Sequence, residues 1–303
     1  MKKTLAIGGA LLLLSSFAFG MVGCEEKKPQ TTGARVPKEL REGYEEKFDG
    51  FVSRVHWIEN RENGKRIYGR LFLPDGFDEK KEYSTLIMSH GYNASGEGGN
   101  NSLIQNVMAK GMIAYTYDFC GGARLSKSEG KTTEMTFKTE ISDLESVFYS
   151  LRAEAYTKDD KMALFGQSFG GLVTSLTAAY HKDDIAAVIL QAPAIAYDVY
   201  SLYESKDDIP ETVENQFMTV SRDFYLAFWD FDILGTIKGW DKDILVTVGT
   251  ADSLLDGVCE SVKVYGDKCK LVVVEDAPHS FQPRDFAIVM PDINAYLEKM
   301  GII

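Results

Sequence analysis

The sequence predicts an α/β fold: a doubly wound, mostly parallel sheet of eight strands, with a helical cap inserted late in the chain. Three observations support this prediction. Short apolar runs recur along most of the chain, helix-length segments separate them, and one connection is far longer than the others. The 303 residues, 45% of them apolar and 26% charged, suffice to bury the core of one such domain.

The chain begins with a segment that we expect to lie outside the folded domain. Residues 1–23 contain two lysines, a long uncharged apolar run and then small residues, as an export signal does. The sequence "MVGC" resembles the lipobox of bacterial lipoproteins, with Met21 where that family usually has Leu. The resemblance implies that Cys24 is lipidated and anchors the protein to a membrane. An uncleaved membrane helix and ordinary secretion are the alternatives, and all three place the domain outside the cytoplasm.

The folded domain is expected to span residues 48–303. Residues 24–47 are polar, contain proline and have no apolar period, so we expect them to form a tether. The net charge of −12 argues against a nucleic-acid partner. No zinc or nucleotide-binding motif is found in the sequence, so neither a metal nor a cofactor is expected. The oligomeric state is left open.

The strands and helices of this domain are predicted in chain order. Residues 51–59 and 65–74 flank the turn sequence "NRENG" and predict an antiparallel hairpin. Continuous apolar runs, typical of parallel strands covered on both faces, follow at 84–90, 112–119, 161–167, 185–193, 243–250 and 269–276. Helical patterns separate them at 102–111, 137–154, 168–182 and 255–266, and a last one covers 284–300.

Residues 196–240 interrupt this alternation. They are rich in aromatic and acidic side chains and are too long for an ordinary connection. We expect a small helical cap over a pocket. The alternative is a structural decoration whose aromatic rings only pack on the domain.

Reactive side chains follow three of the predicted strands at their carboxyl ends. Ser168, Asp252 and His279 come after different strands, and in a parallel sheet these ends share one edge, where ligands bind. "GQSFG" is a G-x-S-x-G sequence between a predicted strand and a predicted helix, the setting of a strained nucleophile turn. Such a turn needs glycine at Gly166 and Gly170, because a Cβ there would clash with neighbouring segments of the backbone.

Position along the chain indicates a role for each of these residues. Ser168 is expected to be the nucleophile, His279 its base, and Asp252 the carboxylate that orients the histidine, with Asp256 as a rival. His56, in the early hairpin, and His181, at the end of the helix after Ser168, are expected to be structural or exposed.

From about Phe48 onward the chain resembles the α/β-hydrolase superfamily. The sequences that carry the resemblance are "HGYN", "GQSFGG", "GTADSLL" and "DAPHSF", in the family's order. It implies the α/β-hydrolase fold, a Ser-His-Asp triad, and an oxyanion hole made by the N–H groups of Phe169 and Tyr92, with Asn93 as an alternative to Tyr92. It also implies that His90 supports the loop.

A narrower resemblance concerns the middle of the chain. "YDFCGGARLSKSEGKTTEMTF", followed by "EISDLESVFYSL", is similar to the cinnamoyl and feruloyl esterases. We therefore expect a serine carboxylesterase for small or aromatic acyl esters, such as hydroxycinnamoyl groups on a polysaccharide. A serine peptidase acting on short peptides and a non-catalytic surface-binding lipoprotein are the alternatives. Cys120 is expected to be buried, and whether Cys259 pairs with Cys269 is left open.

Overall fold

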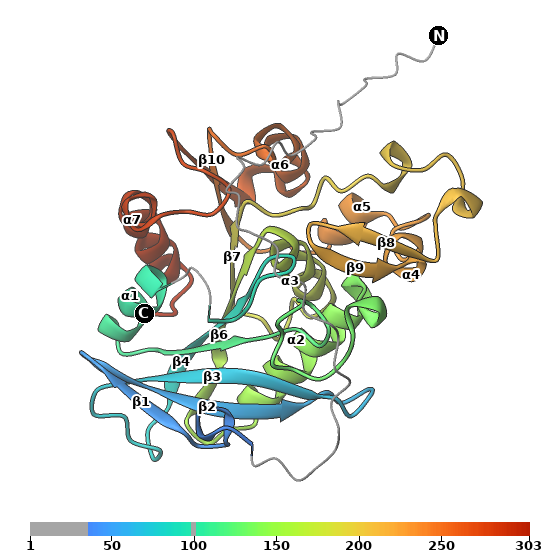
Figure 1. Ribbon diagram of the computed structural model, residues 1–303. Helices are drawn as coiled ribbons and strands as arrows, with labels where there is room; N and C mark the ends of the chain where they lie inside the picture. Colours follow the sequence, from blue (N-terminus) through green and yellow to red (C-terminus); the bar gives the residue numbers. More distant parts are fainter. Residues whose placement is uncertain (1–35, 98–100) are drawn as a thin grey trace.

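A computed structural model describes residues 36–97 and 101–303 and shows a nine-stranded sheet in the order β1-β2-β3-β5-β4-β6-β7-β10-β11 (Figure 1). The strands are β1 (Glu45–Phe48), β2 (Phe51–Glu59), β3 (Arg66–Pro74), β4 (Tyr83–Ser89), β5 (Ile113–Tyr117), β6 (Thr157–Gln167), β7 (Ala187–Gln191), β10 (Ile244–Gly249) and β11 (Cys269–Val274). From β5 to β11 all neighbours pair in parallel, whereas β1, β2, β3 and β5 pair in antiparallel fashion. The mostly parallel α/β sheet expected from the sequence is confirmed.

Helices cover both faces of this sheet. The long helices are α1 (Asn101–Ala109), α2 (Phe137–Arg152), α3 (Ser168–Tyr180) and α7 (Pro283–Lys299), and a shorter one, α6 (Leu255–Ser261), precedes β11. In Figure 1, α1 and α7 lie on one side of the sheet and α2 and α3 on the other. The neighbours Leu86 and Ile87 of β4 accordingly enter two different hydrophobic clusters, because successive side chains of a strand point to opposite faces.

The expected tether and the expected number of strands both need correction. Residues 45–47, assigned to the tether, form most of β1, which pairs with β2 and adds the ninth strand. Its sequence "EEKF" is largely exposed, so this edge strand shows no apolar alternation by which it could be predicted. Residues before it also contact the sheet, since Trp57 Nε1–H donates to the Leu40 carbonyl at 2.8 Å and the Trp57 amide to Glu42 Oε2 at 2.8 Å.

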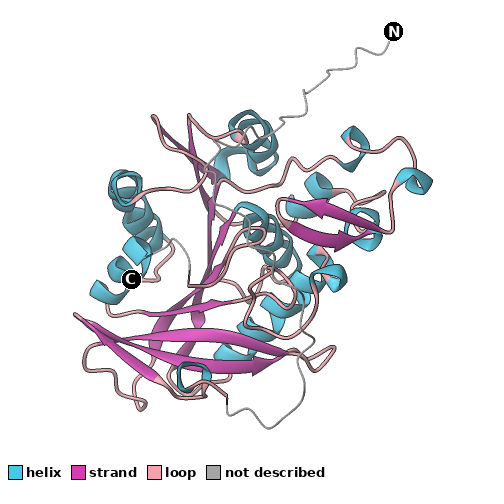
Figure 2. Ribbon diagram, viewed as in Figure 1, coloured by secondary structure: helices cyan, strands magenta, loops and turns pink. Residues whose placement is uncertain are grey.

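The insertion between β7 and β10 is a mixed cap and not the helical one that we expected. It contains an antiparallel hairpin, β8 (Thr212–Asn215) and β9 (Met218–Ser221), and two one-turn helices, α4 (Arg222–Leu226) and α5 (Ile233–Ile237). Figure 2 shows the hairpin apart from the main sheet, among these short helices. The turn residues Gln216 and Phe217 have φ of 47° and 64°. This geometry is usually signalled by Asn-Gly or Gly-Gly, so the hairpin left little trace in the sequence.

The remaining sequence predictions concern the N-terminal segment and the cysteines. The expected signal segment 1–23 and Cys24 are outside the described residues. Among the residues that the structure describes, no helix is long and apolar enough to cross a membrane. Cys120 is buried, and it, Cys259 and Cys269 are free thiols.

Candidate active site

The site is built around the sharp turn from β6 into α3. Ser168 has φ of +54° and directly follows the last residue of β6. A Cβ on Gly170 would lie 2.2 Å from the His90 carbonyl oxygen, and one on Gly166 would lie 2.5 Å from the Gly170 carbonyl oxygen. Only glycine allows the helix to start this close to the end of β4, as predicted from the sequence.

The structure brings Ser168, His279 and Asp252 together. Ser168 Oγ lies 2.9 Å from His279 Nε2, and His279 Nδ1 lies 2.9 Å from Asp252 Oδ2. The Asp252 side chain is fully buried, whereas the His279 side chain is 37% exposed. With the proton on Nδ1, the histidine donates to the carboxylate and accepts from the serine hydroxyl, the arrangement that activates a nucleophile.

Two loops position the acid and the base. A Cβ on Gly249, at the end of β10, would lie 1.9 Å from the Ala277 carbonyl oxygen in the loop after β11. The Ala251 amide donates to that same oxygen at 3.1 Å, and the Leu254 amide donates to Asp252 Oδ1 at 2.9 Å. The loops that follow two neighbouring strands are therefore in direct contact, which brings Asp252 and His279 together.

The rival residues have other partners. Asp256 lies on α6, and the carboxylate hydrogen-bonded to His279 is that of Asp252. His56 Nδ1 lies 3.0 Å from Glu42, and His181 lies between Tyr149 and Glu145.

His90 is buried, and its Nε2 accepts a hydrogen bond from the Phe119 amide at 3.1 Å. Burial lowers the pKa of His90, so the ring is a neutral acceptor that holds the loop.

The loop after β4, residues 90–97, carries the candidate oxyanion-hole residues and is called the oxyanion loop below. A Cβ on Gly91 would lie 3.1 Å from Ser168 Cβ, so the loop directly adjoins the serine. The Asn93 amide donates to the Gly122 carbonyl at 3.2 Å. This bond removes Asn93 from the two alternatives and leaves the N–H groups of Tyr92 and Phe169 as candidates. Phe169 is in the first turn of α3, where amides have no partner within the helix.

Asp118 is a further residue of the site that the sequence analysis did not identify. It is 1% exposed, and its two oxygens accept hydrogen bonds from the Gly96 and Lys127 amides, each at 2.8 Å. Asp118 thereby joins the oxyanion loop to the loop after β5. The one signal in the sequence is its position: Asp118 directly follows the buried strand β5, as Ser168 directly follows β6.

The cap hairpin, β8 and β9, lies against the oxyanion loop. Tyr92 Oη donates to the Asn215 carbonyl at 3.3 Å, and Asn93 Nδ2 donates to the Gln216 carbonyl at 3.0 Å. Both acceptors belong to the tip of the hairpin. The long insertion of the sequence therefore reaches the site, as expected of a cap.

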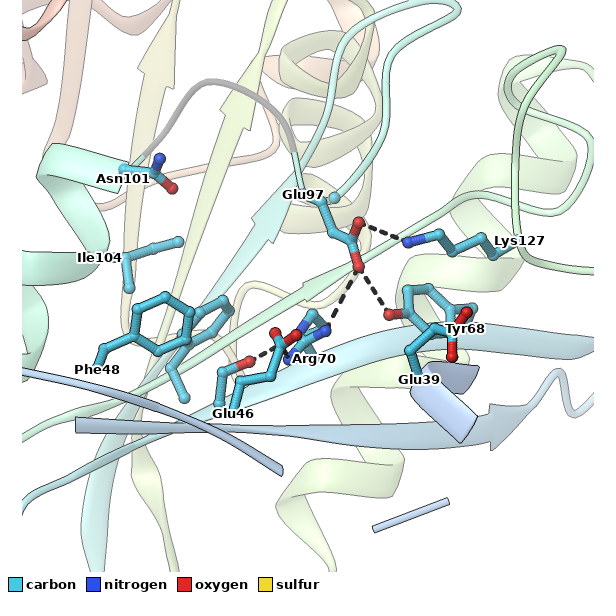
Figure 3. Close-up of a pocket in the computed structure, with 12 residues that line it drawn as sticks. Glu39, Glu46, Phe48, Tyr68, Arg70, Glu97, Asn101, Ile104 and Lys127 are labelled. Carbon is cyan, nitrogen blue, oxygen red and sulfur yellow. Dashed lines mark hydrogen bonds and ion pairs between the residues drawn. The ribbon is translucent and has the colours of Figure 1, made fainter. Parts of the chain in front are cut away.

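A cavity of about 380 Å³ lies on another part of the surface, between the strands β1 to β3 and α1 (Figure 3). Glu97 is its central carboxylate and accepts hydrogen bonds from Tyr68 Oη at 2.7 Å and from Lys127 Nζ at 2.5 Å. Although burial disfavours the charged form, these two hydrogen bonds lower the pKa of Glu97. Arg70 completes the group through an ion pair with Glu46 at 2.5 Å. The polar groups satisfy one another and anchor the far end of the oxyanion loop.

Comparison with known proteins agrees with this fold. A family model described as "Serine aminopeptidase, S33" matches residues 80–224, somewhat less than half of the chain; the match includes Ser168 and ends before Asp252. Est1E from Butyrivibrio proteoclasticus, in a structure with bound ferulic acid, is similar at 20% identity and a TM-score of 0.70, over 81% of this chain and 99% of that one.

Two further structures are similar. The α/β hydrolase GrgF from a Penicillium species has 16% identity and a TM-score of 0.64, over 82% of this chain and 97% of its own. The esterase Pf2001 from Pyrococcus furiosus has 21% identity and a TM-score of 0.58, over 90% and 97%. Together with the sheet order and the turn at Ser168, these similarities establish that the chain has the α/β-hydrolase fold.

Proposed function

We propose that the protein is a serine carboxylesterase that hydrolyses small or aromatic acyl esters. The observation that carries the proposal is the continuous hydrogen-bonded series from Ser168 through His279 to the buried Asp252. A serine hydroxyl is a weak nucleophile unless a base takes its proton, and His279 Nε2 lies at the distance such a transfer needs.

The reaction would proceed in two steps. Ser168 Oγ attacks the ester carbonyl carbon while its proton passes to His279, and the N–H groups of Tyr92 and Phe169 stabilise the oxyanion. His279 then returns the proton to the alcohol oxygen, the C–O bond breaks, and an acyl-enzyme remains. Water, deprotonated by His279, attacks the acyl carbon, and the acid leaves with Ser168 and His279 restored.

Aromatic side chains beside Ser168 support an aromatic acyl group. The Tyr92 and Phe169 rings lie 6.0 Å apart, edge to face; Phe169 directly follows Ser168 in the chain, and Tyr92 follows Gly91, which adjoins Ser168. The similarity to Est1E, whose structure holds ferulic acid, is in keeping with a hydroxycinnamoyl ester as the substrate. The fold alone does not select a substrate, so this part of the proposal rests on the side chains.

The test compares wild type with Ser168→Ala on p-nitrophenyl acetate, p-nitrophenyl butyrate and methyl ferulate. We expect hydrolysis by the wild type and only background rates from Ser168→Ala. His279→Gln should behave like Ser168→Ala, whereas the matched variant His181→Gln should retain activity, because His181 contacts Tyr149 and Glu145 away from the serine. Equal background rates in wild type and Ser168→Ala would contradict an esterase for small or aromatic acyl esters.

A serine peptidase for short peptides is the second candidate, favoured by the family model described as a serine aminopeptidase. The same serine, base and oxyanion hole would cleave an amide. Aminoacyl anilides assayed beside the esters separate the two functions: turnover of anilides with negligible turnover of esters would make the peptidase the better description. Covalent labelling by a fluorophosphonate tests for a non-catalytic binding protein, since only an activated serine reacts readily.

We also propose that the protein is a lipoprotein anchored through Cys24. The apolar run and the "MVGC" sequence support this location. Cys24→Ser should abolish incorporation of labelled palmitate and release the protein from the membrane fraction. Continued membrane association without palmitate would indicate an uncleaved helix, and a fully soluble, cleaved wild type would indicate ordinary secretion.

A further inference from the structure

The side chains of both candidate oxyanion-hole residues pack against the same ring of the cap, Phe224 of α4. We propose that Phe224 is a positioning residue, through which the seated cap orients the N–H groups of Tyr92 and Phe169. The proposal rests on the proposed function, because it concerns the oxyanion hole of the same site. It makes the cap a part of the catalytic geometry in addition to a cover.

Three rings form this contact. Phe224 stacks on Phe169, with ring centroids 5.6 Å apart and an interplanar angle of 29°, and it meets Tyr92 edge to face at 5.8 Å. Tyr92 and Phe169 also contact each other, edge to face, at 6.0 Å. Phe224 is 1% exposed. A close-packed ring that touches both residues restricts where their backbones can lie.

Hydrogen bonds hold the same loop to the cap hairpin. The Tyr92 hydroxyl donates to the Asn215 carbonyl, and the side-chain Nδ2 of Asn93 donates to the Gln216 carbonyl. On its other side, Asn93 Oδ1 accepts a hydrogen bond from the Arg124 amide at 3.0 Å. The loop is thus attached to the cap through two successive side chains, while Gly91, just before them, adjoins Ser168.

The expected consequence is an effect on the chemical step. An N–H donor stabilises the oxyanion only when it points at the place where the negative charge develops, and losing one such donor costs about 10²–10³ in kcat. A loop that has lost its support would donate in poorer geometry, so we expect a loss of about tenfold or more from the same source. Binding of the uncharged ester depends less on these donors, so KM should change little.

The experiment compares Phe224→Leu with Phe231→Leu in the intact protein. Phe231 is a matched control, because it belongs to the same cap but packs on Phe137, at 4.8 Å. For p-nitrophenyl acetate and butyrate, Phe224→Leu should lower kcat about tenfold or more and leave KM within about threefold, and Phe231→Leu should leave both within about threefold. A change in KM or in acyl preference with kcat unaltered would overturn the proposal and make Phe224 part of the substrate-binding wall.

Hydrogen exchange separates this proposal from the proposed function. Amides in peptides covering residues 89–97 and 168–173 should exchange faster in Phe224→Leu than in wild type, but not in Phe231→Leu. This difference in exchange is expected even if the wild type hydrolyses no ester and does not react with a fluorophosphonate. Those two results would contradict the proposed function but not the contact between cap and loop. Unchanged exchange in Phe224→Leu would overturn the coupling between cap and loop.

A milder variant covers the case in which Phe224→Leu does not fold. Tyr92→Phe keeps the three rings and the backbone N–H and removes only the hydroxyl that bonds the Asn215 carbonyl. We expect the same pattern at smaller size: a lower kcat, a steady KM and faster exchange in residues 89–97. No change in any of the three would count against the proposal.

Discussion

Asp252 is a carboxylate whose side chain is removed from water yet accepts hydrogen bonds on both oxygens. Its side chain has no exposed area, His279 Nδ1 lies 2.9 Å from Oδ2, and the Leu254 amide donates to Oδ1. A buried carboxylate is stable only when it has such partners. Its hydrogen bond fixes which nitrogen of His279 carries the proton.

Asp252→Asn tests whether Asp252 keeps the proton of His279 on Nδ1. The amide has nearly the same shape, but with its NH₂ toward His279 it places the ring proton on Nε2, where it can no longer accept from Ser168. We expect kcat to fall by about 10⁴, the loss known for this exchange in such triads, with the fold retained. Ester kinetics and circular dichroism measure the two effects. A loss below about tenfold would show that Asp252 does not orient the histidine.

A second buried carboxyl, Asp143 of α2, is hydrogen-bonded to the loop after β5. It accepts hydrogen bonds from the Cys120 amide and from Asn60 Nδ2, each at 2.7 Å. Burial is the larger effect and raises the pKa of Asp143 to about 6. Because this value lies above the unfolded value of about 3.9, the folded state holds the proton more tightly. Ionised Asp143 therefore costs stability above pH 6, and the cost disappears as the pH falls toward 4.

The variant Asp143→Asn cannot ionise and so lacks this dependence. Between pH 7.5 and pH 4.5, the free energy of unfolding of the wild type should rise relative to that of Asp143→Asn by about 2 kcal/mol. Urea unfolding of both proteins at the two pH values measures the difference. A gap between the two proteins that stays constant with pH would contradict the raised pKa.

At the scale of elements, the turn from β6 into α3 needs glycine because the backbone of α3 lies very close to the backbone at the end of β4. A Cβ on Gly170 would lie within 2.7 Å of the carbonyl oxygens of both His90 and Ser89, and all of these atoms belong to backbone that cannot turn away. The contact at Gly170 thus fixes the distance between the start of α3, which carries Ser168, and the oxyanion loop. A larger side chain at Gly170 should therefore lower both stability and activity.

Gly170→Ala should lower the free energy of unfolding by at least about 2 kcal/mol, because the backbone must shift to admit the methyl group. Gly239→Ala is the comparison, since its nearest neighbour, the Thr236 carbonyl oxygen, would be 3.1 Å from the new carbon. We expect that variant to lose less than about 1 kcal/mol. Urea unfolding and ester hydrolysis of each variant test this, and an active, fully stable Gly170→Ala would contradict the contact.

At the scale of the whole molecule, the segment before the hairpin is part of the domain. Glu46 of β1 makes an ion pair with Arg70, whose side chain is only 9% exposed, and Glu42 and Leu40 accept hydrogen bonds from Trp57. Removing the segment would leave a buried guanidinium without its nearest carboxylate, which is costly.

A version of the protein that begins at residue 50 should be less stable than one that begins at residue 36 by at least about 2 kcal/mol. Glu46→Gln in the longer version isolates the ion pair and should account for part of that loss. Urea unfolding of the three proteins gives the comparison. If the two versions unfold at the same urea concentration, residues 36–49 contribute no stability.

Local pattern was enough to predict the order of strands and helices, the turn at Ser168 and the chain order Ser168, Asp252, His279. These features depend on short-range properties: apolar runs of strand length, the two glycines around the serine, and reactive side chains within a few residues of the ends of three strands. They could be read without knowing which segments touch.

What the sequence left open was decided by contacts between distant segments. The bond from the Asn93 amide to the Gly122 carbonyl leaves the Tyr92 N–H as the candidate oxyanion-hole donor of its loop. The loop contact at Gly249 brings Asp252 and not Asp256 to His279, and the ninth strand and the cap hairpin exist through their pairing. The sequence by itself determined the α/β architecture and the residues of the candidate triad. Only the tertiary structure decided their partners and the shape of the cap, because hydrogen bonds and ring contacts between residues far apart in the chain leave no period or spacing to read.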